Sequence, residues 1–217
     1  MLSIPEITYE GLKSGKYENN LPELYKLKKC VENNAWRNHQ SVFDHTIETF
    51  KELKKLLELE FLEGPKRERL NKKLDEKIGS HNRRDLLVVA SLLHDIAKDE
   101  KLKIKEDGTT ECPSHEVLGS RYVPNFKDKF GLDDSDISFV GKIVAHHGEV
   151  HDFLGKCISD SKNKIGYLEI LKDIIKDVYL EILLLCFADT LGSDLKKNKP
   201  DEFEGRVNLY KELIQSI

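Results

Sequence analysis

The sequence predicts an all-α protein, and three observations support that fold class. Apolar residues recur every three or four positions in most segments of the 217-residue chain, which is the period of one helix face. Residues 86–93 and 179–188 are apolar almost throughout, as expected of buried helices. No segment shows the alternating apolar and polar residues of a strand with one face in solvent.

Composition indicates one sizeable soluble domain in the cytoplasm. Hydrophobic residues make up 39% and charged residues 34% of the chain, and the formal net charge is −4. That charge argues against a stable complex with nucleic acid or an anionic membrane surface, although one nucleotide could bind in a locally positive pocket. No apolar run reaches the roughly 20 residues of a membrane span, and residues 1–6 lack the pattern of a secretion signal. The four cysteines lack C-x-x-C spacing, which favours reduced thiols over a disulfide frame or a zinc ribbon.

Residues 1–20 are expected to be an irregular lead-in, because Gly11 and Gly15 interrupt any periodicity. Residues 21–217 are then expected to form a single domain that ends in an amphipathic helix. Its first element is a short helix over residues 21–33, with a proline at the first helical position.

Two helices are predicted in the next stretch. Ser41 and Asp44 have the spacing of a capping box, so a helix is expected over residues 41–60 with His45 in its first turn. A Gly-Pro pair then breaks the chain, and residues 66–78 carry apolar side chains at every fourth position among charged ones. That pattern predicts an amphipathic helix on the surface.

The apolar helix over residues 86–93 ends in a group of polar residues. His94 and Asp95 follow it directly, and Lys98 lies one helical turn after His94. A buried unpaired carboxylate is costly, so a metal ion with His94 as a second ligand would keep Asp95 charged, and Lys98 could hold an anionic substrate. The alternative is a helix end exposed to water, where Lys98 complements the helix dipole.

Two more helices bring histidines. One is predicted over residues 113–130, with His115 in its first turn and Gly131 as its stop signal. The next is predicted over residues 133–147, with Gly148 just past its end. Three imidazoles would then gather around that end: His146, His147 and His151.

The C-terminal part is predicted to hold three helices. A short one covers residues 168–175. The second apolar run, residues 179–188, delivers Asp189, whose burial would pose the same problem as that of Asp95. Pro200 separates a last amphipathic helix from it.

Several helices therefore each bring a possible metal ligand to an end or an edge. The candidates are His45, His94 with Asp95, His115, His146 or His147, and Asp189. Two buried carboxylates repel each other unless a cation lies near both. Imidazole and carboxylate ligands without a thiolate suit Mn, Fe, Co, Ni, Zn or Mg. Each residue alone is a weak signal, because a single buried histidine is more often a satisfied core residue and Asp189 alone could cap a following helix.

The order of these residues resembles the H…HD…H…H…D signature of the HD-domain metal-dependent phosphohydrolases. Residues 94–98, His-Asp-Ile-Ala-Lys, are similar to that superfamily's H-D-hydrophobic-small-Lys segment. Four further segments resemble the HD domain of bacterial tRNA nucleotidyltransferases: residues 21–24, 42–46, 114–119 and 188–189. The resemblance covers roughly residues 21–195 and implies a single compact helical HD-domain fold.

Two departures limit the resemblance. The tRNA enzymes carry a nucleotidyltransferase head that residues 1–20 could not supply, so nucleotide addition is not expected. The adjacent pair His146 and His147 resembles the double histidine of the HD-GYP cyclic-dinucleotide phosphodiesterases. However, residues 148–152 lack the Gly-Tyr-Pro of that branch, so membership is not expected.

The resemblance implies one or two divalent metal ions. The ligands of the first would be His45, His94, Asp95 and Asp189. Those of the second would be Asp95 as a bridge, His115 and His146. The metal would activate water for attack on phosphorus, with Asp95 central to catalysis. Lys98 would clamp phosphate oxygens, and His147 would either donate a proton to the leaving oxygen or have a structural role.

These residues predict a metal-dependent phosphohydrolase, a phosphomonoesterase or phosphodiesterase, whose partner is a small phosphorylated substrate such as a nucleotide. Two alternatives stay open. The same ligand set would serve a di-iron protein that uses dioxygen to oxidise a small molecule. A non-catalytic nucleotide-sensing module is the other, although the complete ligand set argues against it. The sequence does not indicate the oligomeric state or a role for His151.

Overall fold

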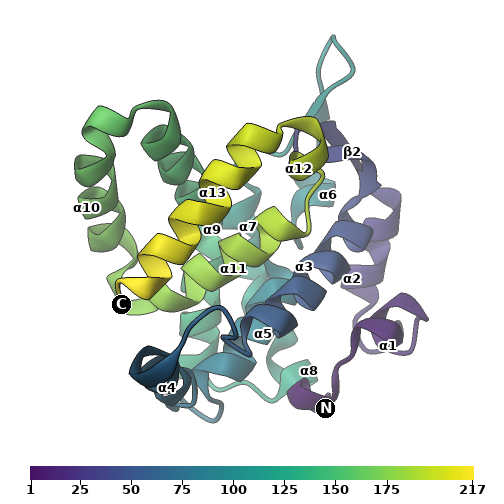
Figure 1. Cartoon of the computed structure of the whole chain (residues 1–217). Coiled ribbons are helices and arrows are strands. Elements are labelled where there is room, and N and C mark those ends of the chain that lie inside the picture. The colour runs from purple at the N-terminus through teal and green to yellow at the C-terminus, as the bar shows by residue number, and fades with distance from the viewer.

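Helices arranged around one core make up most of the protein (Figure 1). The computed structural model describes residues 1–217, and 54 buried residues form a single hydrophobic cluster. The only strands belong to two small antiparallel hairpins. The predicted all-α fold class is therefore confirmed. No helix is both long enough and apolar enough to cross a membrane.

Five helices pack together at the centre: α3 (Val42–Leu56), α5 (Arg83–Leu93), α7 (His115–Tyr122), α9 (Asp134–Ser159) and α11 (Tyr179–Leu191). The other helices are α1 (Tyr9–Lys13), α2 (Pro22–Lys26), α4 (Gly64–Leu74), α6 (Lys98–Lys101), α8 (Lys127–Phe130), α10 (Lys164–Ile175), α12 (Leu195–Asn198) and α13 (Pro200–Gln215). Short 3-10 turns lie at residues 4–6, 27–29, 123–126, 161–163 and 176–178. In Figure 1, α13 runs alongside α11 and in front of α9, and it contacts both.

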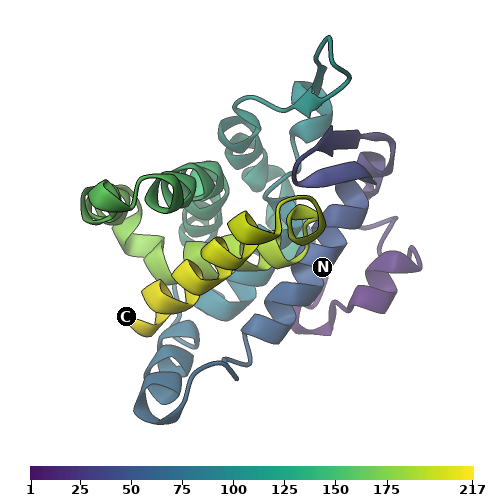
Figure 2. The same cartoon turned by 45° about the horizontal axis from the view of Figure 1, so that its top comes forward.

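The predicted N-terminus of α3 is confirmed. The Ser41 side chain accepts a hydrogen bond from the Asp44 backbone N–H, as an N-cap residue does. The helix ends at Leu56, four residues before the predicted end. The N-terminal 20 residues are more ordered than a loose lead-in, because α1 packs against α3 (Figure 2) and buries Leu12 in the common core.

The first hairpin begins before the end of a predicted helix. The helix expected over residues 21–33 ends after one turn of α2 and a 3-10 turn, and the chain continues as β1 (Val31–Asn34) and β2 (Arg37–Ser41). The Asn34 side chain causes the reversal, because its Oδ1 accepts hydrogen bonds from the backbone N–H groups of Trp36 and Arg37. Sequence periodicity carries no signal for such a side-chain turn.

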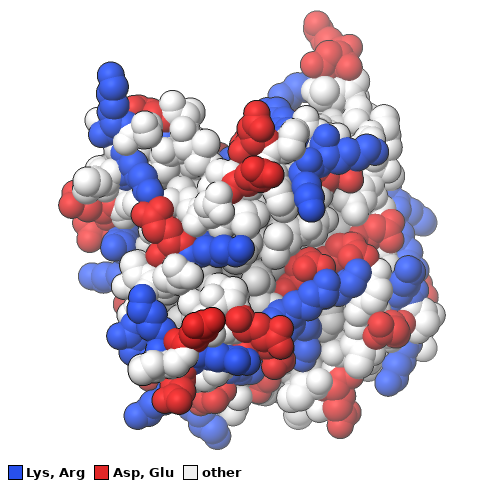
Figure 3. Space-filling view, viewed as in Figure 1, with Lys and Arg blue, Asp and Glu red and all other residues white.

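The second hairpin, β3 (Lys103–Ile104) with β4 (Thr110–Glu111), projects at the end of the molecule that carries β1 and β2 (Figure 2). The two hairpins lie side by side, and the Asn33 backbone N–H donates to Thr110 Oγ1 at 2.8 Å. The surface is hollowed between this end and the α10 side (Figure 3).

The prediction that a helix ends at His147 is wrong, because α9 continues through Gly148 to Ser159. Gly148 lies within the helix, against the Glu116 side chain of α7, and does not end it. A Cβ added at this position would lie 2.2 Å from Oε1 of Glu116 on α7. His146, His147 and His151 therefore lie within one continuous helix.

Gly192, the C-cap residue of α11, allows α11 to approach α3. A Cβ at this position would lie 2.9 Å from the Thr49 backbone nitrogen and 3.2 Å from the Glu48 carbonyl carbon. Backbone atoms in the middle of a helix cannot move aside as a flexible side chain can. The contact holds Asp189, three residues earlier on α11, beside His45, one turn earlier on α3.

We predict that Gly192→Ala lowers the free energy of unfolding by about 1–3 kcal/mol, because the added methyl group forces α11 away from α3. Gly166→Ala is the matched control, since nothing lies within 4 Å of a Cβ in that position of α10. It should leave stability unchanged or raise it by up to about 1 kcal/mol. Urea denaturation of both variants tests this, and equal stability of the two would contradict the proposed close contact.

Candidate metal centre

The site lies where α5 ends inside the protein. All of α5 from Leu86 to Leu93 is buried, and so are His94, its C-cap residue, and Asp95. The chain then turns before α6, and the Lys98 backbone N–H donates to the Asp95 carbonyl. The buried and almost entirely apolar part of α5 thus delivers a carboxylate to the interior, where that charge requires partners.

Asp95 is surrounded by imidazole nitrogens and one ammonium group. Its Oδ1 lies 3.0 Å from His115 Nε2 and 3.6 Å from His147 Nε2. Its Oδ2 lies 3.3 Å from His94 Nε2 and 3.1 Å from Lys98 Nζ. Burial alone would raise the pKa of Asp95, but the neighbouring His94 and Lys98 outweigh it and hold this pKa well below its usual range. Asp95 is therefore ionised.

The three histidines around Asp95 are oriented in the same way. Each Nδ1 lies 2.8 Å from the carbonyl oxygen three residues earlier, that of Ser91, Cys112 or Val144. A carbonyl only accepts, so each Nδ1 carries the proton and donates it. In the neutral ring the Nε2 lone pair then faces Asp95, which is the usual arrangement of a metal-ligating histidine. Burial lowers the pKa of His147, which keeps that ring neutral.

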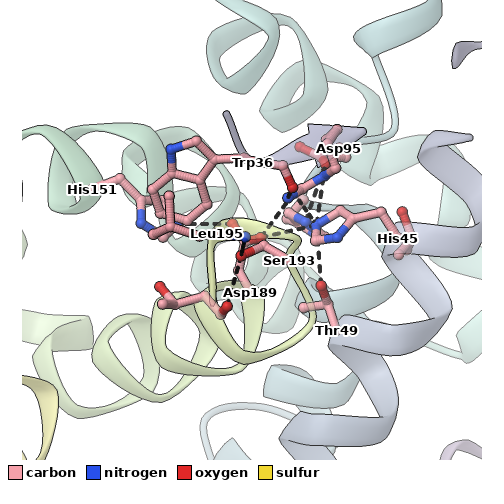
Figure 4. Close-up of polar contacts among 12 residues, drawn as sticks. Trp36, His45, Thr49, Asp95, His151, Asp189, Ser193 and Leu195 are labelled. Carbon is pink, nitrogen blue, oxygen red and sulfur yellow. Dashed lines mark hydrogen bonds and ion pairs between the residues drawn. The ribbon is translucent and has the colours of Figure 1, made fainter. Parts of the chain in front are cut away.

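A second group of polar side chains surrounds Asp189 (Figure 4). Its Oδ1 lies 2.9 Å from His45 Nε2 and 3.0 Å from Arg37 Nη2, and His151 Nε2 donates to its Oδ2 at 2.8 Å. Burial would raise the pKa of Asp189, but His45 and His151 outweigh it and hold it well below its usual range. Burial, followed by the positive charge of Arg37, lowers the pKa of His45 to about 4, so this ring is neutral.

The buried ligand atoms form two sets of three. Within each set, all three atoms lie within 4.8 Å of one another. One set is His45, His94 and Asp189, and the other is Asp95, His115 and His147. The residues fit a divalent cation, because His94 Nε2 and Asp95 Oδ2 are buried and have no hydrogen-bond partner. Asp95 Oδ2 is at ion-pair distance from Lys98 but accepts no hydrogen bond. A buried acceptor without a partner is costly, and a cation between these atoms would satisfy both.

The structure brings together most of the predicted site residues: His45, His94, Asp95, Lys98, His115, His147 and Asp189. It does not bring His146 to them. The His146 side chain is 33% exposed and pairs with Glu149 at 2.7 Å, whereas that of His147 is 4% exposed and faces Asp95. The structure thus places His147 beside Asp95, where His146 was predicted. Successive residues of a helix point about 100° apart, so only one of the pair can face the site.

Three further residues lie in the site: Glu32 and Arg37, which the sequence did not indicate, and His151, to which it assigned no role. Arg37 and Glu32 come from the β1–β2 hairpin and are buried, and no local pattern indicated that this segment reaches the site. His151 follows His147 by four residues and so lies on the same face of a helix. This four-residue spacing is a sequence signal, but it applies only within a helix, and the helix was predicted to end at His147.

An open pocket of about 480 Å³ lies above these groups. Asp95, Lys98, His115, His147 and Asp189 form part of its lining, and only three of its 17 lining residues are hydrophobic. Its wall includes Trp36, whose ring lies 4.8 Å from the His151 ring and 4.8 Å from the Arg206 guanidinium carbon. The buried polar groups are therefore accessible to a small polar ligand.

The fold and the two ligand sets define the class: an all-α protein with buried His/Asp groups that suit divalent metal ions. The family model of the HD domain matches residues 42–165, which is more than half of the chain. The protein therefore belongs to the HD-domain family, part of a superfamily of metal-dependent phosphohydrolases. No curated protein matches the chain.

We predict that His147→Ala lowers the amount of divalent metal retained by the purified protein, whereas His146→Ala, the matched control one residue away, leaves it unchanged. His147 offers an Nε2 lone pair to the site and His146 does not. Elemental analysis after dialysis against metal-free buffer measures the difference. Greater loss of metal in the His146 variant than in the His147 variant would contradict the assignment.

Proposed function

We propose that the protein is a metal-dependent phosphohydrolase that cleaves a phosphomonoester or phosphodiester of a nucleotide or a related small molecule. One observation carries the proposal: an ionised, buried Asp95 lies among three imidazole Nε2 atoms and an ammonium group, below an open polar pocket. Membership of the HD-domain family supports the same reaction class.

Asp95 links the two ligand sets. It belongs to the set with His115 and His147, and its Oδ2 also lies 3.8 Å from His45 Nε2 in the other set. A divalent cation held by these groups would supply Lewis-acid polarisation of a phosphoryl oxygen and a water of low pKa. The backbone carbonyls behind His94, His115 and His147 fix the rings, so the ligand atoms need little reorganisation on binding.

Lys98 provides a permanent positive charge at the base of the pocket. Its Nζ lies 2.8 Å from Glu32 Oε2 and 3.1 Å from Asp95 Oδ2. Burial would lower the pKa of Lys98, but Asp95 and Glu32 outweigh it and raise this pKa. The ammonium group therefore stays charged under all ordinary conditions. In the proposed reaction it attracts the phosphate and stabilises charge on its non-bridging oxygens.

The walls of the pocket support a small phosphorylated substrate with an aromatic part. Trp36, His151 and Arg206 offer flat faces or edges against which a nucleobase can pack. The volume of about 480 Å³ suits a small ligand. Figure 3 shows acidic and basic side chains interspersed on the visible face, without the basic track that an extended nucleic acid would require.

The buried cations distinguish this proposal from its alternatives. Arg37 and Lys98 both line the pocket, and once a divalent cation offsets the buried carboxylates these two positive side chains favour an anionic substrate. A non-catalytic sensor would not need Nε2 lone pairs gathered around an ionised carboxylate.

We predict that Asp95→Ala abolishes metal retention and lowers phosphoester hydrolysis by about 10³-fold or more, because the group shared between the ligand sets is lost. The assay panel contains 2′,3′-cyclic nucleotides, 2′-, 3′- and 5′-nucleotides, dinucleotides and a chromogenic phosphate, with His146→Ala as the control. Activity on 2′,3′-cyclic nucleotides would support the proposed closeness to the tRNA nucleotidyltransferase branch. Unchanged turnover in the Asp95 variant would reject the proposed function.

Lys98→Met is predicted to raise KM with the metal retained, and to lower the free energy of unfolding by about 3 kcal/mol, because Glu32 and Asp95 lose a buried partner. The double variant Glu32→Gln with Lys98→Met should recover much of that stability but not the KM. Substrate titrations and urea denaturation separate the two effects. A KM that recovers together with stability would show that Lys98 is only structural.

A further inference from the structure

The side chain of Arg37, a residue of the β1–β2 hairpin, contacts one of the two ligand sets directly. Its side chain is 4% exposed, and both Arg37 and Asp189 fall outside the residues matched by the HD-domain model. Arg37 Nη2 contacts His45 Nε2 and lies 3.0 Å from Asp189 Oδ1. One nitrogen of the guanidinium thus touches two of the three atoms of that ligand set.

The Arg37 contact determines which atoms carry lone pairs. A guanidinium nitrogen can only donate, so His45 Nε2 must accept from it. His45 Nε2 and Asp189 Oδ1 are then two electron-pair donors only 2.9 Å apart, and the Thr49 hydroxyl also donates to that Nε2 at 3.1 Å. Two such atoms repel each other unless they share a cation, and the guanidinium is the cation they share here.

A metal ion would need the same two lone pairs. A divalent cation at the set of His45, His94 and Asp189 bonds to the atoms that now accept hydrogen bonds from Arg37. The guanidinium and the ion would also repel each other at this separation. Arg37 and a metal ion therefore exclude each other at these two atoms.

Hydrogen bonds hold the backbone of Arg37 in place, so its guanidinium can leave the two ligand atoms only by a movement of the side chain. The hairpin is attached to the end of α11: the Asp194 backbone N–H donates to the Trp36 carbonyl, and the Asn38 backbone N–H donates to Asp194 Oδ2, both at 2.9 Å. Within the side chain, Nη1 donates to the Trp36 carbonyl and Nε has no hydrogen-bond partner. The guanidinium lines the pocket, so on leaving the two ligand atoms it stays among the groups that face the substrate.

The charges of the buried side chains indicate how the Arg37 guanidinium would act after a metal ion displaces it. Three buried carboxylates, Glu32, Asp95 and Asp189, face the two cations Arg37 and Lys98. The side chains alone therefore leave one excess negative charge, which disfavours a phosphate. One divalent cation reverses that sign and frees the planar donor group of Arg37, whose geometry matches phosphate oxygens.

We infer that Arg37 is a displaceable counter-cation, which neutralises His45 and Asp189 until a divalent metal ion takes these ligands and then binds the phosphoryl group of the substrate. The second half of this inference rests on the proposed phosphohydrolase function. Arg37 thereby couples metal loading to phosphate binding.

Two equilibrium measurements test the inference, with Mn²⁺ and inorganic phosphate as probes. Arg37→Gln in the metal-free protein should bind Mn²⁺ about tenfold more tightly than the native chain, because the competing cation is gone. The Mn²⁺-loaded variant should bind phosphate about tenfold more weakly, because a charge-assisted donor is lost. Titration calorimetry measures both, and Trp36, the single tryptophan, provides an independent fluorescence signal.

Arg206→Gln is the matched control for the first measurement. It removes one positive charge from the same pocket, but Arg206 bonds to Glu202 and the His151 carbonyl and to none of the ligand atoms. Its Mn²⁺ affinity should stay within about threefold of the native value. Circular dichroism verifies folding, and Arg37→Met serves as the second uncharged variant if Arg37→Gln does not fold.

The outcomes separate this inference from the proposed function. Equal or weaker Mn²⁺ binding after loss of the Arg37 charge overturns the competition, even if the native protein hydrolyses phosphoesters. Tighter Mn²⁺ binding with unchanged phosphate affinity overturns the phosphate role. A protein whose Arg37 variant gains Mn²⁺ affinity and loses phosphate affinity as expected, yet which hydrolyses no phosphoester, leaves the metal competition and the phosphate contact standing and rejects the proposed reaction.

Discussion

The negative charge of Asp95, which follows the buried stretch Leu86–Leu93 of α5, is the constraint on which the rest of the site depends. A carboxylate away from water is tolerated only among positive or hydrogen-bonding partners. Imidazoles arrive from α7, from α9 and from His94 beside it, and Lys98 supplies an ammonium group. Even with these partners its Oδ2 accepts no hydrogen bond, which leaves a place for a cation.

The charges of the site form one alternating chain that joins the two ligand sets. Asp95 pairs with Lys98, Lys98 with Glu32, and Arg37 lies between Glu32 and Asp189. Burial alone would raise the pKa of Glu32, but Lys98 and Arg37 outweigh it and lower this pKa. Glu32 is thus a charged bridge between two cations, and a change at either end alters the electrostatic potential at the other.

Much of the helical framework could be predicted because its signals are local. The Ser41 cap of α3, the apolar runs that become α5 and α11, and the proline at the start of α13 all act within a few residues of the chain. The placement of His146 was wrong for an equally local reason. Gly148 resembles a helix stop in sequence, but it does not adopt the left-handed backbone of a helix-ending glycine, and α9 continues to Ser159.

The sequence by itself determined which residues would have to be buried as charges and which residue types could compensate them. The apolar runs before Asp95 and Asp189 indicated buried carboxylates, and the histidines near predicted helix ends were the residue types that could compensate them with a metal ion. Only the tertiary structure decided that His147 and not His146 faces Asp95, and that a hairpin carries Glu32 and Arg37 into the site. The physical reason is that burial follows from local composition and periodicity, whereas the pairing of charges 60 or more residues apart follows from how the helices pack. For example, the Lys98–Glu32 and Arg37–Asp189 pairs are separated by 66 and 152 residues.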